Sequence, residues 1–186
     1  MKKLFKLQYN SPVVLTFALV SLAALLLGKL TDGWTTQHLF SVWHSPLSDF
    51  LTYPRFILHV LGHADYSHYI GNMMMILVVG PSLEEKYGSR NLLNAIIITA
   101  LVSGVIHWAF FPGSALLGAS GIVFMMIVMA SLAGMRDGGI PITLILVLIL
   151  YLGGEIVDGI MLSDNVSQLT HIVGGICGAF LGLRKR

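Results

Sequence analysis

The sequence predicts an all-α, polytopic membrane protein with six transmembrane helices. Of its 186 residues, 55% are hydrophobic and only 11% are charged, and the mean hydropathy is +0.81. Soluble domains carry about 25% charged residues, so a chain of this length could not hide so much apolar surface from water. A series of long apolar runs, separated by charged, proline or glycine turns, points the same way. We therefore expect residues 1–186 to form a single membrane domain.

Each expected span is an apolar run near the roughly 20 residues that a helix needs to cross a bilayer. The first run, 12–30, is too long for the apolar part of a typical secretion signal and lacks a clear small-residue cleavage site, so we interpret it as a retained span. The other spans are expected at about 66–83, 92–110, 120–135, 140–156 and 169–183. Pro141 suits the first turn of the fifth of these helices.

Residues 31–65 form a long first loop that is too polar to span and too aromatic for an ordinary solvated loop. Its aromatic side chains are Trp34, Phe40, Trp43, Phe50 and Tyr53. Such residues favour the boundary between membrane and water, so we expect an interfacial loop.

The basic residues predict the orientation. With both termini in the cytoplasm, all of the eleven lysines and arginines except Lys29 and Arg55 lie on the inner side, as the positive-inside rule requires. No basic cluster interleaved with aromatics suggests a nucleic-acid partner. Cys177 is the only cysteine, so the sequence offers no internal disulfide and no cysteine-based zinc site.

The first candidate for chemistry is Gly118-Ala119-Ser120-Gly121, at the expected start of the fourth span. A serine there lies where unpaired helix N–H groups favour developing negative charge, and the flanking glycines let a substrate approach closely. This suits a nucleophile. Taken alone, the motif is more often a helix-capping serine between packing glycines.

Two further clusters supply groups that such a serine would need. His171 shares one helix face with Gly174 and Gly178, which allow close approach of a neighbouring helix, and histidine is the usual base for activating serine. His68 and Asn72 lie four residues apart, so their donors can converge as in an oxyanion hole. Each cluster could instead hold helices together by hydrogen bonds.

Other kinds of site are poorly supported. The histidines at positions 59, 63 and 68 raise the question of zinc, but their spacing does not keep all three on one face and His-Glu-x-x-His is absent, so we expect no metal and no cofactor. The paired aspartates of an aspartyl intramembrane protease, with Gly-x-Gly-Asp, are missing. The spans contain too little charge for a transporter or channel.

Taken together and in order, these motifs resemble those of the rhomboid family, and the resemblance runs from about Arg55 to Leu183. It rests on His59 and His63, on His68 and Asn72, on the turn from Glu84 to Ser89, on Gly118 to Gly121, and on His171, Gly174 and Gly178. The family comprises rhomboid-like helical bundles, and this chain resembles its minimal six-span bacterial type.

The resemblance implies an intramembrane serine endopeptidase with a serine–histidine dyad and an acyl-enzyme. Ser120 would be the nucleophile and His171 the base, while the Ser120 N–H, His68 and Asn72 would hold the oxyanion. It also implies single-span membrane proteins as substrates, a bacterial inner membrane, and a site opening to the outer side.

Two positions depart from the usual pattern: Thr170 stands where a small alanine is common, and Phe124 where tyrosine is common. The alternative is a catalytically inactive rhomboid-like protein that binds membrane-protein clients. Retention of the complete set of catalytic and oxyanion residues favours activity.

Overall fold

The computed structural model describes residues 9–134, 142, 145, 146, 149 and 165–184, and the regular elements within this part of the chain are all helical. The elements are α1 (Pro12–Leu30), α2 (Trp34–His38), α3 (Thr52–Leu58), the 3-10 turn η1 (His59–Leu61), α4 (Tyr66–Tyr87), α5 (Ser89–Phe110), α6 (Ser120–Ala133) and α8 (Asn165–Arg184). Two of the described helices, α1 and α5, are long and apolar enough to cross a membrane.

The expected fifth span, 140–156, lies outside the described residues except at four positions. These positions are helical and exposed: Ile142, Ile145, Leu146 and Ile149.

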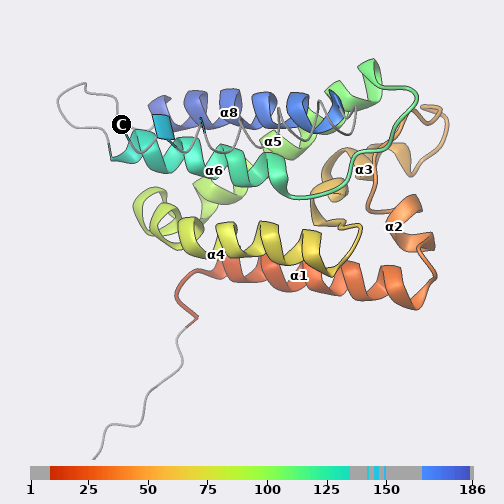
Figure 1. Cartoon of the computed structure of the whole chain (residues 1–186), viewed down its shortest axis with the longest axis horizontal. Helices are drawn as coiled ribbons and strands as arrows, with labels where there is room; N and C mark the ends of the chain where they lie inside the picture. Colours follow the sequence, from red (N-terminus) through yellow and green to blue (C-terminus); the bar gives the residue numbers. More distant parts are fainter. Residues whose placement is uncertain (1–8, 135–141, 143–144, 147–148, 150–164, 185–186) are drawn as a thin grey trace, which may run out of the picture.

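The helices pack around α6. Helix α1 lies along α4, α8 lies along α6, and α5 contacts both α6 and α8 (Figure 1). Helices α4, α6 and α8 all begin at the end of the bundle that carries the first loop with α2 and α3. The N-terminal turns of three helices therefore meet at one end, which is where the candidate site residues lie.

Helix α6 is the core helix of the described bundle. Every residue from Gly121 to Met129 is buried, as expected of a helix that is apolar on all sides and surrounded by others. Helix α8 approaches it backbone to backbone: a Cβ atom on Gly178 would lie 2.5 Å from the Met125 carbonyl oxygen. A Cβ on Gly174 would clash with the Gly121 carbonyl oxygen in the same way. These two glycines let the helices touch.

The sequence-based prediction that Glu84 begins a charged turn was wrong, because α4 continues to Tyr87. Glu84 is only 4% exposed, and its carboxylate accepts hydrogen bonds from the Val13 and Val14 amides at 3.0 and 3.1 Å. Those amides lie in the first turn of α1, where helical N–H groups lack partners within the helix. The carboxylate thus caps a neighbouring helix, and Gly88, with φ +80°, ends α4.

Replacing Glu84 with glutamine is expected to lower the free energy of unfolding by about 2 kcal/mol. The amide keeps one acceptor oxygen but leaves one buried N–H of α1 without a partner, and removes a charged acceptor. The measurement is denaturant unfolding in mild detergent. Glu85→Gln is the matched control, since Glu85 is the exposed neighbour; equal losses in both variants would contradict the capping role.

The first loop is folded around a buried arginine and contains α2 and α3, which were not among the predicted elements. Arg55 is 2% exposed; its Nε donates to the His38 carbonyl at 2.7 Å and its Nη1 to Asp49 Oδ2 at 2.8 Å. The loop also reaches the segment before α6, where Val42 and Leu116 form an antiparallel bridge with two 2.9 Å hydrogen bonds. The loop is therefore part of the framework of the site.

Candidate active site

The segment that precedes Ser120 is held by backbone hydrogen bonds from the first loop. The Gly118 amide donates to the His59 carbonyl at 3.0 Å, two residues beyond the bridge at Leu116. Gly118 has φ +122°, in the region that favours glycine, and Ala119 is the residue before the helix. Ser120 is thus the first residue of α6 and is partly exposed. Ser120 therefore follows a constrained turn between an extended segment and a helix.

His68 and Asn72 lie against this turn. An ideal Cβ on Gly118 would be 2.8 Å from His68 Nε2 and 3.9 Å from Asn72 Nδ2, so the two side chains cover the glycine backbone. Asn72 is 7% exposed, and its Nδ2 has no hydrogen-bond partner among the described residues. Asp65 fixes the start of α4 by accepting the His68 amide at 2.8 Å. The site therefore holds a buried amide donor beside the backbone that leads to Ser120.

His171 lies where α8 meets the first turn of α6. It is 1% exposed, and its ring centroid is 6.0 Å from that of Phe124, with the planes tilted by 46°. A Cβ on Gly121, the residue after the serine, would lie 2.9 Å from Thr170 Cγ2. Together with the contact between Gly121 and Gly174, this packing brings residues 170–174 of α8 against the N-terminus of α6.

The predicted candidate residues therefore gather at one end of the bundle, on the first two turns of three different helices. Ser120 and Gly121 come from α6, His171 from α8, and His68 and Asn72 from α4. Such convergence of a potential nucleophile, a potential base and amide donors can support acyl transfer.

Several residues that shape the site were not predicted for that role. Val42 and Leu116 hold the loop before Ser120 through main-chain atoms, and a single bridge leaves no periodic pattern in a sequence. The His59 carbonyl acts through its backbone as well. The one sequence signal for a role of His59 was the presence of a polar residue in the apolar stretch before α4.

The histidines considered for zinc make other contacts. His59 Nε2 donates to the Ala100 carbonyl at 3.1 Å, and His63 Nδ1 donates to the Leu61 carbonyl at 3.1 Å. His63 and His68 meet edge to face, with ring centroids 5.1 Å apart. Within the described ranges, no group of three His, Cys, Asp or Glu side chains is arranged to hold a metal ion.

The stability of the fold is expected to fall in acid because His59 is buried as the neutral imidazole. Burial lowers the pKa of His59 from 6.5 to about 4, and its Nδ1 has no hydrogen-bond partner among the described residues. Because the folded pKa lies below the unfolded one, this stabilisation is complete above pH 6.5 and is lost as the pH falls. The loss reaches about 3 kcal/mol near pH 4.

The test compares unfolding free energies of the wild type and His59→Gln between pH 7 and pH 4. The glutamine amide can still donate to the Ala100 carbonyl but does not titrate. The variant is expected to show the shallower pH dependence. Parallel profiles would mean that His59 does not contribute to acid sensitivity.

Comparison with known proteins places this arrangement in a family. The rhomboid domain matches residues 51–185. Rhomboid-related protein 1 of Caenorhabditis elegans is 32% identical over 139 residues, which cover 69% of this chain and 38% of that protein. Rhomboid protease GlpG of Salmonella newport (strain SL254) is 28% identical over 188 aligned positions, covering 94% of this chain and 64% of that protein.

The chain thus spans less than two thirds of the length of these curated relatives. The matched domain nevertheless extends over most of the 186 residues and includes every candidate site residue. The chain therefore belongs to the rhomboid family and is a polytopic helical membrane protein.

Proposed function

We propose that this chain is an intramembrane serine endopeptidase that cleaves transmembrane segments through a Ser120–His171 dyad. One observation carries the proposal: the packing of three helix starts at one end of the bundle, with His171 on α8, Ser120 on α6 and the His68/Asn72 pair on α4. Membership of a family that includes serine intramembrane proteases supports the same reading.

In the proposed reaction, Ser120 Oγ attacks the scissile carbonyl carbon while a His171 ring nitrogen accepts the hydroxyl proton. The carbonyl oxygen becomes an oxyanion, which the Ser120 N–H and the side chains of His68 and Asn72 stabilise. Collapse breaks the C–N bond, and His171 returns the proton to the leaving amine. Water then attacks the acyl-enzyme by the same route and releases the new carboxylate.

Phe124 is proposed to orient the base. Its ring packs against the His171 imidazole from one turn after the nucleophile. It has no hydroxyl or carboxylate that could hydrogen bond to the imidazole, so its contribution is to restrict the ring orientation by packing.

The substrate is proposed to approach as an extended segment along residues 115–117. Leu116 turns both of its backbone groups toward Val42. In an antiparallel pairing, residues whose backbone groups bond the partner alternate with residues whose groups point away from it, and the backbone groups of Ala115 and Leu117 make no hydrogen bond to a described residue. An extended backbone edge that is open in the described structure and leads directly to Ser120 suits a peptide unwound from a helix.

The proposed setting is a bacterial inner membrane that is crossed by six spans with both termini in the cytoplasm. Lys86 and Arg90 lie at the α4–α5 turn, at the opposite end of α4 from His68 and Asn72. The positive-inside rule puts that turn in the cytoplasm, so the site would open to the outer side. Single-span membrane proteins are the expected substrates.

The proposal is tested by reconstituting the protein in liposomes with a single-span reporter that has small residues near the outer end of its helix. We expect the wild type to cut the reporter within its membrane segment and Ser120→Ala to leave it intact. Binding of the reporter by both proteins with cleavage by neither would favour the non-cutting, client-binding alternative.

A further inference from the structure

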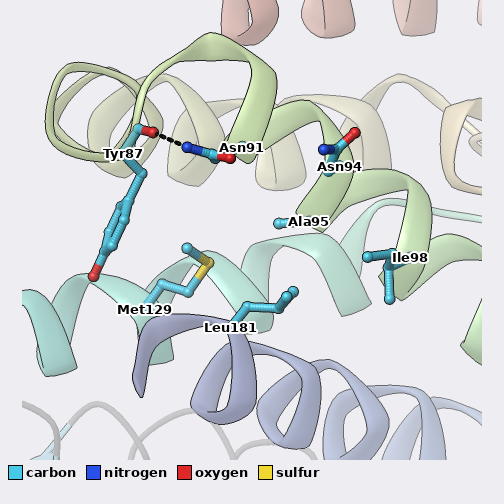
Figure 2. A pocket seen from close by; sticks show the side chains of 7 residues that line it. All are labelled: Tyr87, Asn91, Asn94, Ala95, Ile98, Met129 and Leu181. Carbon is cyan, nitrogen blue, oxygen red and sulfur yellow. Dashed lines mark hydrogen bonds between the residues drawn. The ribbon is translucent and has the colours of Figure 1, made fainter. Parts of the chain in front are cut away.

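A hollow lies far from the candidate active site, at the opposite end of α4. It has a volume of about 290 Å³ and is lined by Tyr87, Asn91, Asn94, Ala95, Ile98, Met129 and Leu181 (Figure 2). These residues come from the end of α4, the first turns of α5 and the last turns of α6 and α8. Tyr87 is 15 residues beyond Asn72 on α4, or about 22 Å along the helix. The hollow is therefore separate from the proposed catalytic machinery.

The wall formed by α5 is polar at its start. Asn91 Nδ2 donates to the Tyr87 carbonyl at 2.6 Å, which fixes the Asn91 side chain on the wall of the hollow (Figure 2). Asn94 is exposed, and its side-chain amide makes no hydrogen bond to any described residue. This side-chain amide can therefore bond a group from outside the chain.

A free cation lies one turn earlier on the same face of α5. Arg90 is exposed and makes no ion pair within the described part of the chain. Lys86 is engaged nearby: its Nζ donates to the Ala133 carbonyl at 2.6 Å and lies 5.6 Å from the centroid of the Tyr87 ring. Lys86 is therefore occupied within the bundle, whereas the Arg90 guanidinium is available to an anion.

Beyond Asn94 the same face of α5 becomes aliphatic. Ile98 lines the hollow, and Leu101 and Val105 continue from it at helical spacing; all three are exposed. From Arg90 to Val105 the stripe is about 22 Å long. It changes along its length from cation to amide to hydrocarbon, which is the order of phosphate, glycerol ester and acyl chain in a phospholipid.

We propose that this hollow is a specific binding site for an anionic phospholipid. Arg90 binds the phosphate, the Asn94 amide donates to a glycerol ester carbonyl, and one acyl chain lies in the hollow between Ile98 and Leu181 and continues along the aliphatic stripe. The guanidinium and the amide, neither of which has a partner among the described residues, lie beside a hollow at membrane-interface depth, and this combination distinguishes the face from the purely apolar faces of the bundle. The occupant is a lipid rather than a soluble phosphate ester because most of the lining is apolar.

The test is lipid binding to the full chain in detergent, counted by native mass spectrometry during titration with dioleoyl phosphatidylglycerol. Arg90→Gln is expected to weaken binding about fivefold, since one basic residue near an anionic headgroup contributes about that factor. Ile98→Trp is expected to abolish the specific adduct by filling the hollow from its rim. Lys29→Gln is the matched control, because it also removes one exposed positive charge, at the far end of α1.

Selective loss in Arg90→Gln and Ile98→Trp, with unchanged binding in Lys29→Gln and unchanged unfolding temperatures in lipid-free detergent, supports the site. Equal binding by all four proteins overturns it. Equal losses in both charge variants also overturn it, because net charge would then explain the binding. Displacement of the lipid by millimolar glycerol 3-phosphate would indicate a soluble phosphate ester as ligand and would contradict the assignment of a lipid.

Discussion

Replacing His171 with alanine is expected to lower the rate of reporter cleavage by about four orders of magnitude while leaving the protein folded. Without the imidazole, nothing at the start of α8 can take the proton from Ser120 or return it to the leaving amine. Packing supports this role, because residues 170–174 lie against the first turn of α6. The measurement is initial cleavage velocity in liposomes, with unfolding followed in parallel.

Two controls separate chemistry from packing. Cys177→Ala removes a buried side chain from the same helix, away from the proposed dyad, and is expected to retain most of the activity. Imidazole added to His171→Ala should restore part of the rate, because it can occupy the vacated space and act as the base. A variant that is folded and still cuts at more than about a tenth of the wild-type rate would remove His171 from the mechanism.

Replacing Gly174 with alanine is expected to destabilise the protein by about 3 kcal/mol and to lower activity more than tenfold. The new methyl group would meet the Gly121 carbonyl oxygen and would lie 3.1 Å from the Gly121 carbonyl carbon. Backbone atoms cannot rotate away, so α8 must move off α6. That movement would carry His171 away from Ser120, which explains the expected effect on the reaction.

The matched control lies two turns further along α8. A Cβ on Gly182 would lie 3.0 Å from Leu132 Cδ1, the end of a side chain that can change rotamer. Gly182→Ala should therefore be neutral or stabilising, because alanine favours helix by about 1 kcal/mol over glycine. The measurement is unfolding in detergent together with cleavage velocity. Equal stability of the two variants would contradict a backbone contact between α6 and α8 at Gly174.

Much of the helical layout could be predicted because apolar run length governs it. The range expected for the first span, 12–30, coincides with α1, which begins with a proline at its first position. The end of α4 was placed wrongly because three charged residues in a row suggest a turn. Glu84 stays helical because its carboxylate bonds the first turn of α1, a tertiary contact that local sequence does not report. Helix α8 likewise begins at Asn165, four residues before the expected start of the sixth span at 169.

The site residues could be proposed from the sequence because the members of each cluster are spaced so that they share one helix face. His68 and Asn72 lie one turn apart, and their common contact with Gly118 follows from that. The framework that holds the nucleophile loop could not be predicted in the same way. The Val42–Leu116 bridge and the bond from Gly118 to the His59 carbonyl use main-chain atoms from distant segments, and any side chain could supply those.

The central claim is that Ser120 is activated by His171. Its most direct test is labelling of the purified, detergent-solubilised protein with a fluorophosphonate probe, beside Ser120→Ala and His171→Ala. If His171 activates Ser120, the probe will label the wild type and will label neither variant. Equal labelling of all three proteins, or none in a folded wild type, would contradict the dyad.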